Sequence, residues 1–336
     1  MAQHLEAARA VLAGVKRDLM RKANVVAVGI GYKTAGGVQS EEIAIICSVE
    51  KKLPGADLPA ADRVPDSFQG IPTDVIETGR IVAQQDPTGK IRPVPGGVSV
   101  GHRAITAGTL GCWVKKNGEF HALSNNHVLA DSNRASIGDA ILQPGPHDSG
   151  VYPRDRIAEL SAFIPIQFGG PDNLVDAAIA RAVEVENGGS GCAFAGAIAR
   201  VLNRGAAAAG RKTRLKPVKI SAIEDVVRNE ILNIGVVSEL AEATLGMEVK
   251  KMGRTTGLTF GAVQQIDATV KVDYGNQSAF FVDQIITTDM SQGGDSGSAV
   301  VAKNDNKLVA LLFAGSDTIT VMNRIQNVFS ALGITF

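Results

Sequence analysis

Apolar residues near the start of the chain recur with the period of a helix and then with that of strands. The helical positions are spaced alternately by three and four residues, at Leu5, Ala8, Leu12, Val15 and Leu19. This spacing predicts one apolar face of a helix over residues 3–22. Two strand-like runs follow at 25–33 and 41–52, and the turn-forming TAGG between them predicts a hairpin. With a short strand at 73–78, they predict a small α+β unit.

Beyond residue 97 the chain consists mainly of short apolar runs separated by glycine. These runs occupy residues 108–130, 174–183, 248–274, 280–288 and 307–315. Many short strands with few helices predict a β-barrel or β-sandwich architecture. NDN at 304–306 is typical of a hairpin turn. Apolar residues at helical spacing in 323–333, with Asn323 as N-cap and Gly333 as C-terminal stop, predict one closing helix.

Residues 187–223 differ in charge from the rest of the chain. They contain no acidic residue and seven basic ones, namely Arg200, Arg204, Arg211, Lys212, Arg214, Lys216 and Lys219. Charge runs are usually solvated, so we interpret this segment as a long connection between two barrels. A loop for partner docking or self-cleavage is the alternative.

Composition excludes several classes of protein. The 336 residues carry a formal net charge of zero, which argues against a nucleic-acid binder or a protein of anionic membrane surfaces. No run approaches the ~20 apolar residues of a membrane span. The N-terminal helix is charged throughout, unlike a secretory signal, and we therefore expect a cytoplasmic protein. The three cysteines, Cys47, Cys112 and Cys192, are scattered and lack metal-ligand spacing, so we expect no disulfide scaffold, metal or cofactor.

The glycine-rich stretch QGGDSGSAV (292–300) contains a serine, Ser296, between Asp295 and Gly297. By itself it reads equally as a turn, because these residue types dominate turns. A serine hydroxyl becomes a useful nucleophile only beside a base, and the base needs an acid to orient it. Of five histidines, His127 in LSNNHVLA opens an apolar run, and Asp176 lies in the apolar VDAAIA. A buried carboxylate there requires a partner.

Together, NNHV, DAAIA and GDSGS occur in the order His, Asp, Ser, which is the chain order of chymotrypsin-type triads. The chain from about residue 97 to its end resembles the trypsin-like, chymotrypsin-fold serine peptidases, and particularly their disulfide-poor bacterial members. GTLGC, GRTTG (253–257) and the terminal helix also match the family pattern. The resemblance implies a mainly β fold of two antiparallel six-stranded β-barrels with a C-terminal helix, preceded by the small α+β N-terminal domain.

We accordingly predict four parts of the chain. They are an N-terminal domain at 1–91, a first barrel with His127 and Asp176 at 92–186, the basic connection at 187–230, and a second barrel with Ser296 at 231–336. The N-terminal domain is expected to regulate the enzyme or to bind a protein partner.

The resemblance implies a serine endopeptidase with His127 as general base and acid, Asp176 as its orienting acid and Ser296 as nucleophile. The backbone N–H groups of Gly294 and Ser296 would form the oxyanion hole. Ala314 and Gly315, at the end of a strand that pairs with the substrate, would form one wall of the primary specificity pocket. Many family members use a freed N-terminus to pair with the acid beside the nucleophile. Here cleavage after Arg92 would expose a proline, so we expect local hydrogen bonds to hold that loop instead.

The floor of the specificity pocket has two candidates. Counting back six positions from Ser296, as the family does, reaches Met290, which favours a small or apolar P1 side chain. The doubled glycine at 293–294 could shift the count to Asp289, which favours Arg or Lys. We expect the first.

Two other functions compete with an active endopeptidase that cleaves protein or peptide substrates. One is a scaffold that keeps the peptidase fold and binds partners without turnover. The other is an esterase with the same triad chemistry.

Overall fold

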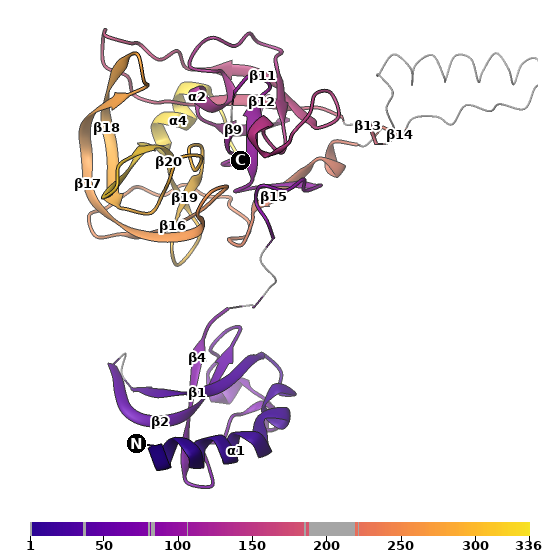
Figure 1. The fold of residues 1–336 in the computed structure, drawn as a ribbon, viewed down its shortest axis with the longest axis vertical. Coiled ribbons are helices and arrows are strands. Elements are labelled where there is room, and N and C mark those ends of the chain that lie inside the picture. The colour runs from indigo at the N-terminus through magenta and orange to yellow at the C-terminus, as the bar shows by residue number, and fades with distance from the viewer. Residues whose placement is uncertain are drawn as a thin grey trace, which may run out of the picture. The chain divides into compact units, whose positions relative to one another are not determined.

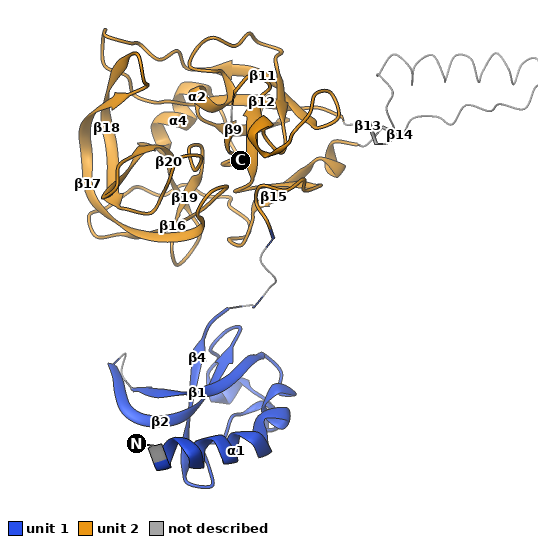
Figure 2. Cartoon of the chain, viewed as in Figure 1, with its two compact units in different colours: residues 1–85 blue, residues 86–336 orange. Residues whose placement is uncertain are grey.

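The computed structural model describes residues 2–35, 38–79, 81, 85–105, 107–184, 186–187, 219–220 and 222–336. The chain divides into two compact units, residues 1–85 and 86–336 (Figure 2). Most of the basic segment predicted at 187–223 lies outside the described residues. No helix of the described part is long and apolar enough to cross a membrane.

The first unit is a helix on a four-stranded sheet (Figure 1). Its elements are α1 (Ala2–Met20), β1 (Val25–Ala35), β2 (Val38–Val49), the 3₁₀ turns Gly55–Asp57 and Ala60–Asp62, β3 (Ser67–Phe68) and β4 (Ile71–Glu77). The sheet order is β1-β2-β4-β3, with β1 and β2 antiparallel and β2 and β4 parallel. Leu19 of α1 is fully buried in the same cluster as Ile45 of β2. The predicted helix, hairpin and strand are therefore confirmed.

The boundary between the units precedes residue 91 because residues 86–92 are bonded to the second unit. Lys90 Nζ lies 2.7 Å from Asp155 Oδ1. The Ile91 N–H donates to Gln143 Oε1 at 3.1 Å. These contacts make the end of the expected linker part of the second unit.

The first barrel is formed by β6 (Ser99–His102), β7 (Gly108–Thr109), β8 (Cys112–Lys116), β9 (Glu119–Ser124), β10 (Ala140–Leu142), β11 (Arg156–Phe163) and β12 (Ala178–Ala182). The sheet order is β7-β6-β10-β11-β12-β9-β8. Its first and last members, β7 and β8, are two halves of one interrupted stretch, 108–116. Leu110 N–H donates to Val98 on one side, and Gly111 N–H to Leu123 on the other. The sheet therefore closes on itself as a six-stranded barrel.

The second barrel is a closed ring in the order β16-β17-β18-β21-β20-β19. Its strands are β16 (Glu248–Gly253), β17 (Gly257–Asp273), β18 (Ser278–Thr288), β19 (Ala299–Ala302), β20 (Leu308–Gly315) and β21 (Ile319–Arg324). The β19–β20 hairpin predicted around NDN is confirmed. The mainly β class with two antiparallel barrels is thus confirmed (Figure 1).

Short elements complete the second unit. They are β5 (Val94–Gly96), α2 (Asn126–Leu129), the 3₁₀ turns Pro146–Asp148 and Ile223–Asp225, β13 (Glu186–Asn187), β14 (Lys219–Ile220), β15 (Val227–Ile231) and α4 (Ile325–Leu332). The closing helix α4 ends at Gly333, whose φ of +61° is the left-handed conformation that glycine favours. Arg324, and not Asn323, occupies the N-cap position, and Asn323 belongs to β21. The predicted capping role of Asn323 is therefore wrong.

Candidate active site

The Ser296 loop, residues 289–298, joins β18 to β19. Gly294 has a φ of +97°, a conformation that side chains with a Cβ rarely adopt. A Cβ at Gly294 would also lie 2.5 Å from Thr255 Oγ1 and 2.9 Å from Arg254 Nη1. The loop therefore requires glycine at this position for its conformation and for space.

The two backbone donors expected for an oxyanion are free of other partners. Among the hydrogen bonds of the described residues, neither the Gly294 N–H nor the Ser296 N–H has an acceptor. Thr255 Oγ1 donates to the carbonyl oxygen of Gly293 at 2.8 Å. In a trans peptide the N–H points opposite to the C=O, so this bond fixes the direction of the Gly294 N–H. The hydroxyl of Thr109 holds the next carbonyl, that of Gly294, at 2.9 Å.

Asp295, beside the serine, is fully buried and organises the loop from within. Its carboxylate accepts N–H bonds from Thr255, Thr256 and Gln292 at 2.9, 3.2 and 3.0 Å. These are the expected local hydrogen bonds. An unexpected cation joins them, since Lys251 Nζ lies 3.1 Å from Asp295 Oδ2. Burial lowers the pKa of Lys251, and the Asp295 carboxylate partly offsets that effect.

His127 and Asp176 are directly hydrogen-bonded. His127 lies on α2, and its Nδ1 is 2.6 Å from Asp176 Oδ2. The His127 N–H also donates to Asp176 Oδ1, at 3.2 Å. Asp176 is completely buried, whereas 22% of the His127 side chain is exposed. The carboxylate thus orients an imidazole whose other edge remains accessible.

The main chain of Asp176 is held by two asparagines, one from each barrel. Asn125 Nδ2 donates to the Asp176 carbonyl at 2.8 Å. Asn323 Oδ1 accepts the Asp176 N–H at 3.0 Å, and its Nδ2 donates to the Asp176 carbonyl at 3.2 Å. The side chain of Asn323 therefore clamps the orienting acid from the second barrel.

His127 and Ser296 line one cavity of about 470 Å³, together with Gly294 and Tyr274. The three residues predicted as a triad come from both barrels, and the fold brings them to one place. Asp176 lies behind His127 and contacts it on the side facing away from bulk water.

A second cavity, of about 450 Å³, adjoins Ser296 on the other side of the loop. Ala314 and Gly315 line it, as expected for a pocket wall. Asp289 and Asp317 line it as well, and no Lys or Arg does. Both aspartates are exposed.

Met290 does not lie in that cavity, so its predicted place in the specificity pocket is wrong. Its side chain is only 4% exposed and packs in the second barrel's core. Its N–H donates to Thr320 Oγ1 at 3.1 Å, and its carbonyl accepts from Thr259 Oγ1 at 2.7 Å. Because these bonds fix the main chain of Met290, the preceding side chain, Asp289, is the one that reaches the cavity.

Four site residues escaped the sequence analysis: Lys251, Thr255, Tyr274 and Asn323. Lys251 had one signal, since a lysine in the strand EVKKMG must either point to solvent or find a buried anion. Thr255 lies in GRTTG, a motif that matched the family pattern, but the sequence analysis assigned no role to its residues. No local pattern marked Tyr274, and Asn323 had been assigned a helix-capping role instead.

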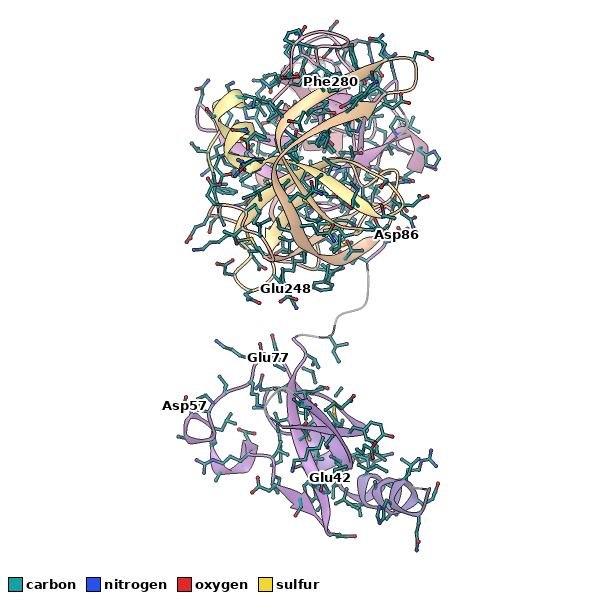
Figure 3. The ribbon with its side chains drawn as sticks, turned by 90° about the vertical axis from the view of Figure 1, so that its left-hand side faces the viewer. Glu42, Asp57, Glu77, Asp86, Glu248 and Phe280 are labelled. Atoms are coloured by element: carbon teal, nitrogen blue, oxygen red, sulfur yellow. The ribbon has the colours of Figure 1, made fainter. Side chains whose placement is uncertain are left out.

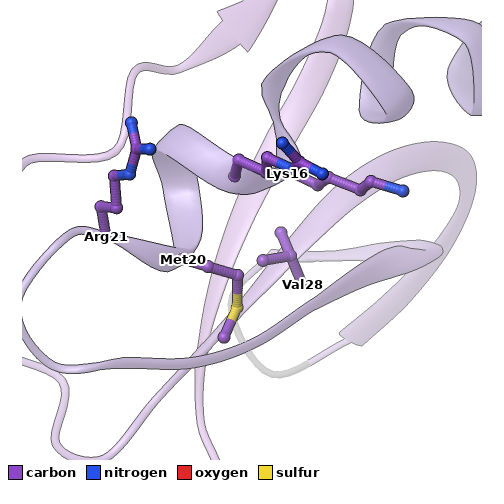
Figure 4. Close-up of a pocket in the computed structure, with 5 residues that line it drawn as sticks. Lys16, Met20, Arg21 and Val28 are labelled. Atoms are coloured by element: carbon purple, nitrogen blue, oxygen red, sulfur yellow. The ribbon is translucent and has the colours of Figure 1, made fainter.

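The first unit carries a separate cavity of about 570 Å³ (Figure 4). Lys16, Arg17 and Met20 of α1 line it with Arg21, which directly follows the helix, and Val28 of β1. It has three cationic side chains and no nucleophile, acid or histidine.

Neither a family model nor a curated protein matches the chain. Solved structures of bacterial proteases align with about three quarters of the chain at low sequence identity. Thermobifida fusca Protease A and Nocardiopsis Protease each cover 72% of this chain and 97% of their own, with 16% and 15% identity and TM-scores of 0.43. Cellulomonas bogoriensis chymotrypsin covers 72% and 97%, with 18% identity and a TM-score of 0.42.

Proposed function

We propose that the chain is a serine endopeptidase that hydrolyses peptide bonds through an acyl-enzyme intermediate. The observation that carries the proposal is the 2.6 Å contact between His127 Nδ1 and the buried Asp176, in a cavity that His127 shares with Ser296. A base oriented by an acid beside a serine is the arrangement that activates a hydroxyl.

In the proposed reaction Ser296 Oγ attacks the peptide carbonyl carbon while its proton passes to His127 Nε2. Asp176 stabilises the imidazolium that forms. The negative oxygen of the tetrahedral intermediate accepts hydrogen bonds from Gly294 N–H and Ser296 N–H, which are free in this structure. His127 then gives the proton to the leaving amine, and the C–N bond breaks.

Water then hydrolyses the acyl-enzyme. In this half of the reaction water is the nucleophile and Ser296 is the leaving group. His127 takes a proton from the water, whose oxygen attacks the ester carbonyl. The second tetrahedral intermediate collapses, Ser296 leaves, and His127 returns the proton to Ser296 Oγ. Neither half of the reaction needs a further cofactor.

We further propose that the enzyme prefers Arg or Lys at P1. The two carboxylates in the cavity next to Ser296, those of Asp289 and Asp317, support this choice, because a cationic side chain would pair with them. A small or apolar P1 side chain would leave both without a cationic partner. This reverses our expectation from the sequence.

A fluorophosphonate probe and a library of denatured peptides test the activity together. We expect the probe to label Ser296 in wild type and not in Ser296→Ala, and we expect the cleaved bonds to follow Arg or Lys. A folded wild-type protein that neither reacts with the probe nor cleaves peptides would instead support a non-catalytic scaffold. Cleavage of esters but not peptides would indicate an esterase.

We propose that the first unit regulates the enzyme by binding a partner. The groove lined by Lys16, Arg17, Met20, Arg21 and Val28 supports a binding role (Figure 4). Deleting residues 1–85 tests it, because residues 86–92 belong to the catalytic unit. We expect peptide cleavage in vitro to persist and the cellular phenotype to be lost. A phenotype that survives the deletion contradicts the regulatory role.

A further inference from the structure

The carboxylate of Asp176 accepts hydrogen bonds from the ring and the backbone N–H of His127. A third donor to this carboxylate is the side chain of Tyr274. The phenol of Tyr274 donates to Asp176 Oδ2 at 2.8 Å, the same oxygen that His127 Nδ1 contacts. Burial and the nearby Asp176 anion raise the pKa of Tyr274, so the phenol remains protonated and acts as the donor.

Tyr274 reaches Asp176 from the other barrel. It follows β17 directly, near the tip of the long β17–β18 hairpin, which extends well beyond the second barrel's ring (Figure 1). Asn173 anchors the hairpin to the first barrel's chain, because its N–H donates to Phe280 and its carbonyl accepts from Val282, both at 2.9 Å. Figure 3 shows Phe280 on this hairpin.

Aromatic contacts fix the ring of Tyr274. It meets Phe168 of the first barrel edge-to-face at 5.5 Å between centroids and lies 6.4 Å from Phe281. The His127 ring is 6.0 Å away, also in an edge arrangement. The phenol oxygen therefore cannot move far from Asp176 unless the hairpin moves.

We propose that Tyr274 is a positioning residue of the catalytic site, which the β17–β18 hairpin supplies to hold the carboxylate of Asp176 in place. The inference rests on the proposed peptidase function. A carboxylate with a second anchor on the oxygen that faces Nδ1 keeps the imidazole in one orientation. The same hydrogen bond withdraws negative charge from that oxygen.

The variant Tyr274→Phe tests the contribution of the hydroxyl separately from that of the aromatic ring. The variant keeps the packing against Phe168 and Phe281 and loses only the donor to Asp176. We expect kcat to fall by roughly tenfold with KM little changed, because one charge-assisted hydrogen bond is lost. We also expect the acid limb of the kcat/KM profile to move to higher pH, since a carboxylate without this donor stabilises the imidazolium more strongly.

Other charged groups near His127 do not change in this variant. Asp131 and Arg134 line the same cavity, but they pair with each other at 2.7 Å. Lys271 and Asp273 precede Tyr274 on β17 and are exposed. A shift of the acid limb in Tyr274→Phe therefore reports on Asp176 and His127.

Tyr152→Phe is the matched control, since Tyr152 is half exposed and makes no contact with the triad. We expect it to behave as wild type. If Tyr274→Phe unfolds at the wild-type temperature and has the wild-type kcat and pH profile, the positioning role is wrong. If wild type itself does not react with the fluorophosphonate probe, the proposed peptidase function is wrong. That result is distinct from a Tyr274→Phe variant that behaves as wild type.

Discussion

The ammonium of Lys251 lies 3.1 Å from the carboxylate of Asp295, and both side chains are completely buried. Asp295 immediately precedes Ser296, so an ion pair internal to the second barrel holds the Ser296 loop. Lys251 belongs to β16, and its Nζ also donates to the carbonyl of Gly257 at 3.2 Å. The carboxylate beside Ser296 is therefore paired with a cation from within the second barrel.

Lys251→Met should destabilise the protein and abolish activity. The change keeps the side chain's length but leaves Asp295 as a buried charge without its cation, at a cost of about 3–5 kcal/mol. Thermal unfolding and fluorophosphonate labelling of Ser296 measure both effects. Lys250→Met on the same strand is the control, because Lys250 is only partly buried and should tolerate the change. Equal losses in the two variants would contradict the role of the ion pair.

Gly294→Ala should reduce kcat by roughly 100- to 1,000-fold, the usual effect of losing an oxyanion donor. The added Cβ would lie 2.5 Å from Thr255 Oγ1 at a φ of +97°, so the loop must rearrange. Gly293→Ala is a matched control, since a Cβ there has nothing within 4 Å. Steady-state kinetics on one peptide compare them. Full activity in Gly294→Ala would show that this amide is not a donor in the reaction.

Thr255→Val should lower kcat by roughly tenfold, because the Gly293 carbonyl loses its 2.8 Å partner and the following N–H is no longer held in one direction. Thr255→Ser retains the hydroxyl and should keep most of the activity. The inhibition constant of a peptide aldehyde, which forms a tetrahedral adduct, should weaken in parallel with kcat. Unchanged aldehyde binding in Thr255→Val would exclude the hydroxyl from organising the oxyanion hole.

Asp289→Asn should lower kcat/KM for substrates with P1 Arg by roughly tenfold to 100-fold, the range for losing a charge-assisted hydrogen bond. Substrates with P1 Leu should be affected little, because they make no such bond. Asp305→Asn is the control, since Asp305 lies in the exposed β19–β20 turn. A wild-type preference for P1 Leu over Arg would overturn the assignment of this pocket.

Acid stability should depend on Asp155, whose buried carboxylate holds the start of the second unit. Burial raises the pKa of Asp155, but hydrogen bonds from Arg154, Lys90 and the Val151 N–H outweigh it and lower the value to about 2. A lowered carboxylate pKa gives stability that is fully present above about pH 4 and lost as pH falls through about 2. Its size is at most roughly 2 kcal/mol, since water screens the exposed cations.

Urea unfolding at several pH values measures this dependence. Asp155→Asn should be less stable at pH 7 and should lose less stability than wild type between pH 4 and pH 2. Asp57→Asn in the first unit is the control for a general effect of removing an exposed carboxylate. Parallel curves for wild type and Asp155→Asn would contradict the prediction.

Elements governed by local periodicity could be predicted from the sequence. The α1 face, the β1–β2 hairpin and α4 follow from spacings within a few residues, and all three are present. The triad candidates were found by residue type and chain order, and the structure brings them together. The Asn323 cap was wrong because a better partner, the main chain of Asp176, lies 147 residues away in the chain.

The sequence alone therefore determined the β-rich architecture, the unit at the N-terminus and the three residues at the centre of the site, because each depends on short patterns or on residue order. Only the tertiary structure decided that Asp289 and not Met290 faces the pocket, since a loop has no repeating side-chain direction. It also decided that Lys251 meets Asp295 and that Tyr274 meets Asp176, 44 and 98 residues away. Such pairs form only when closure of the two barrels brings distant strands together.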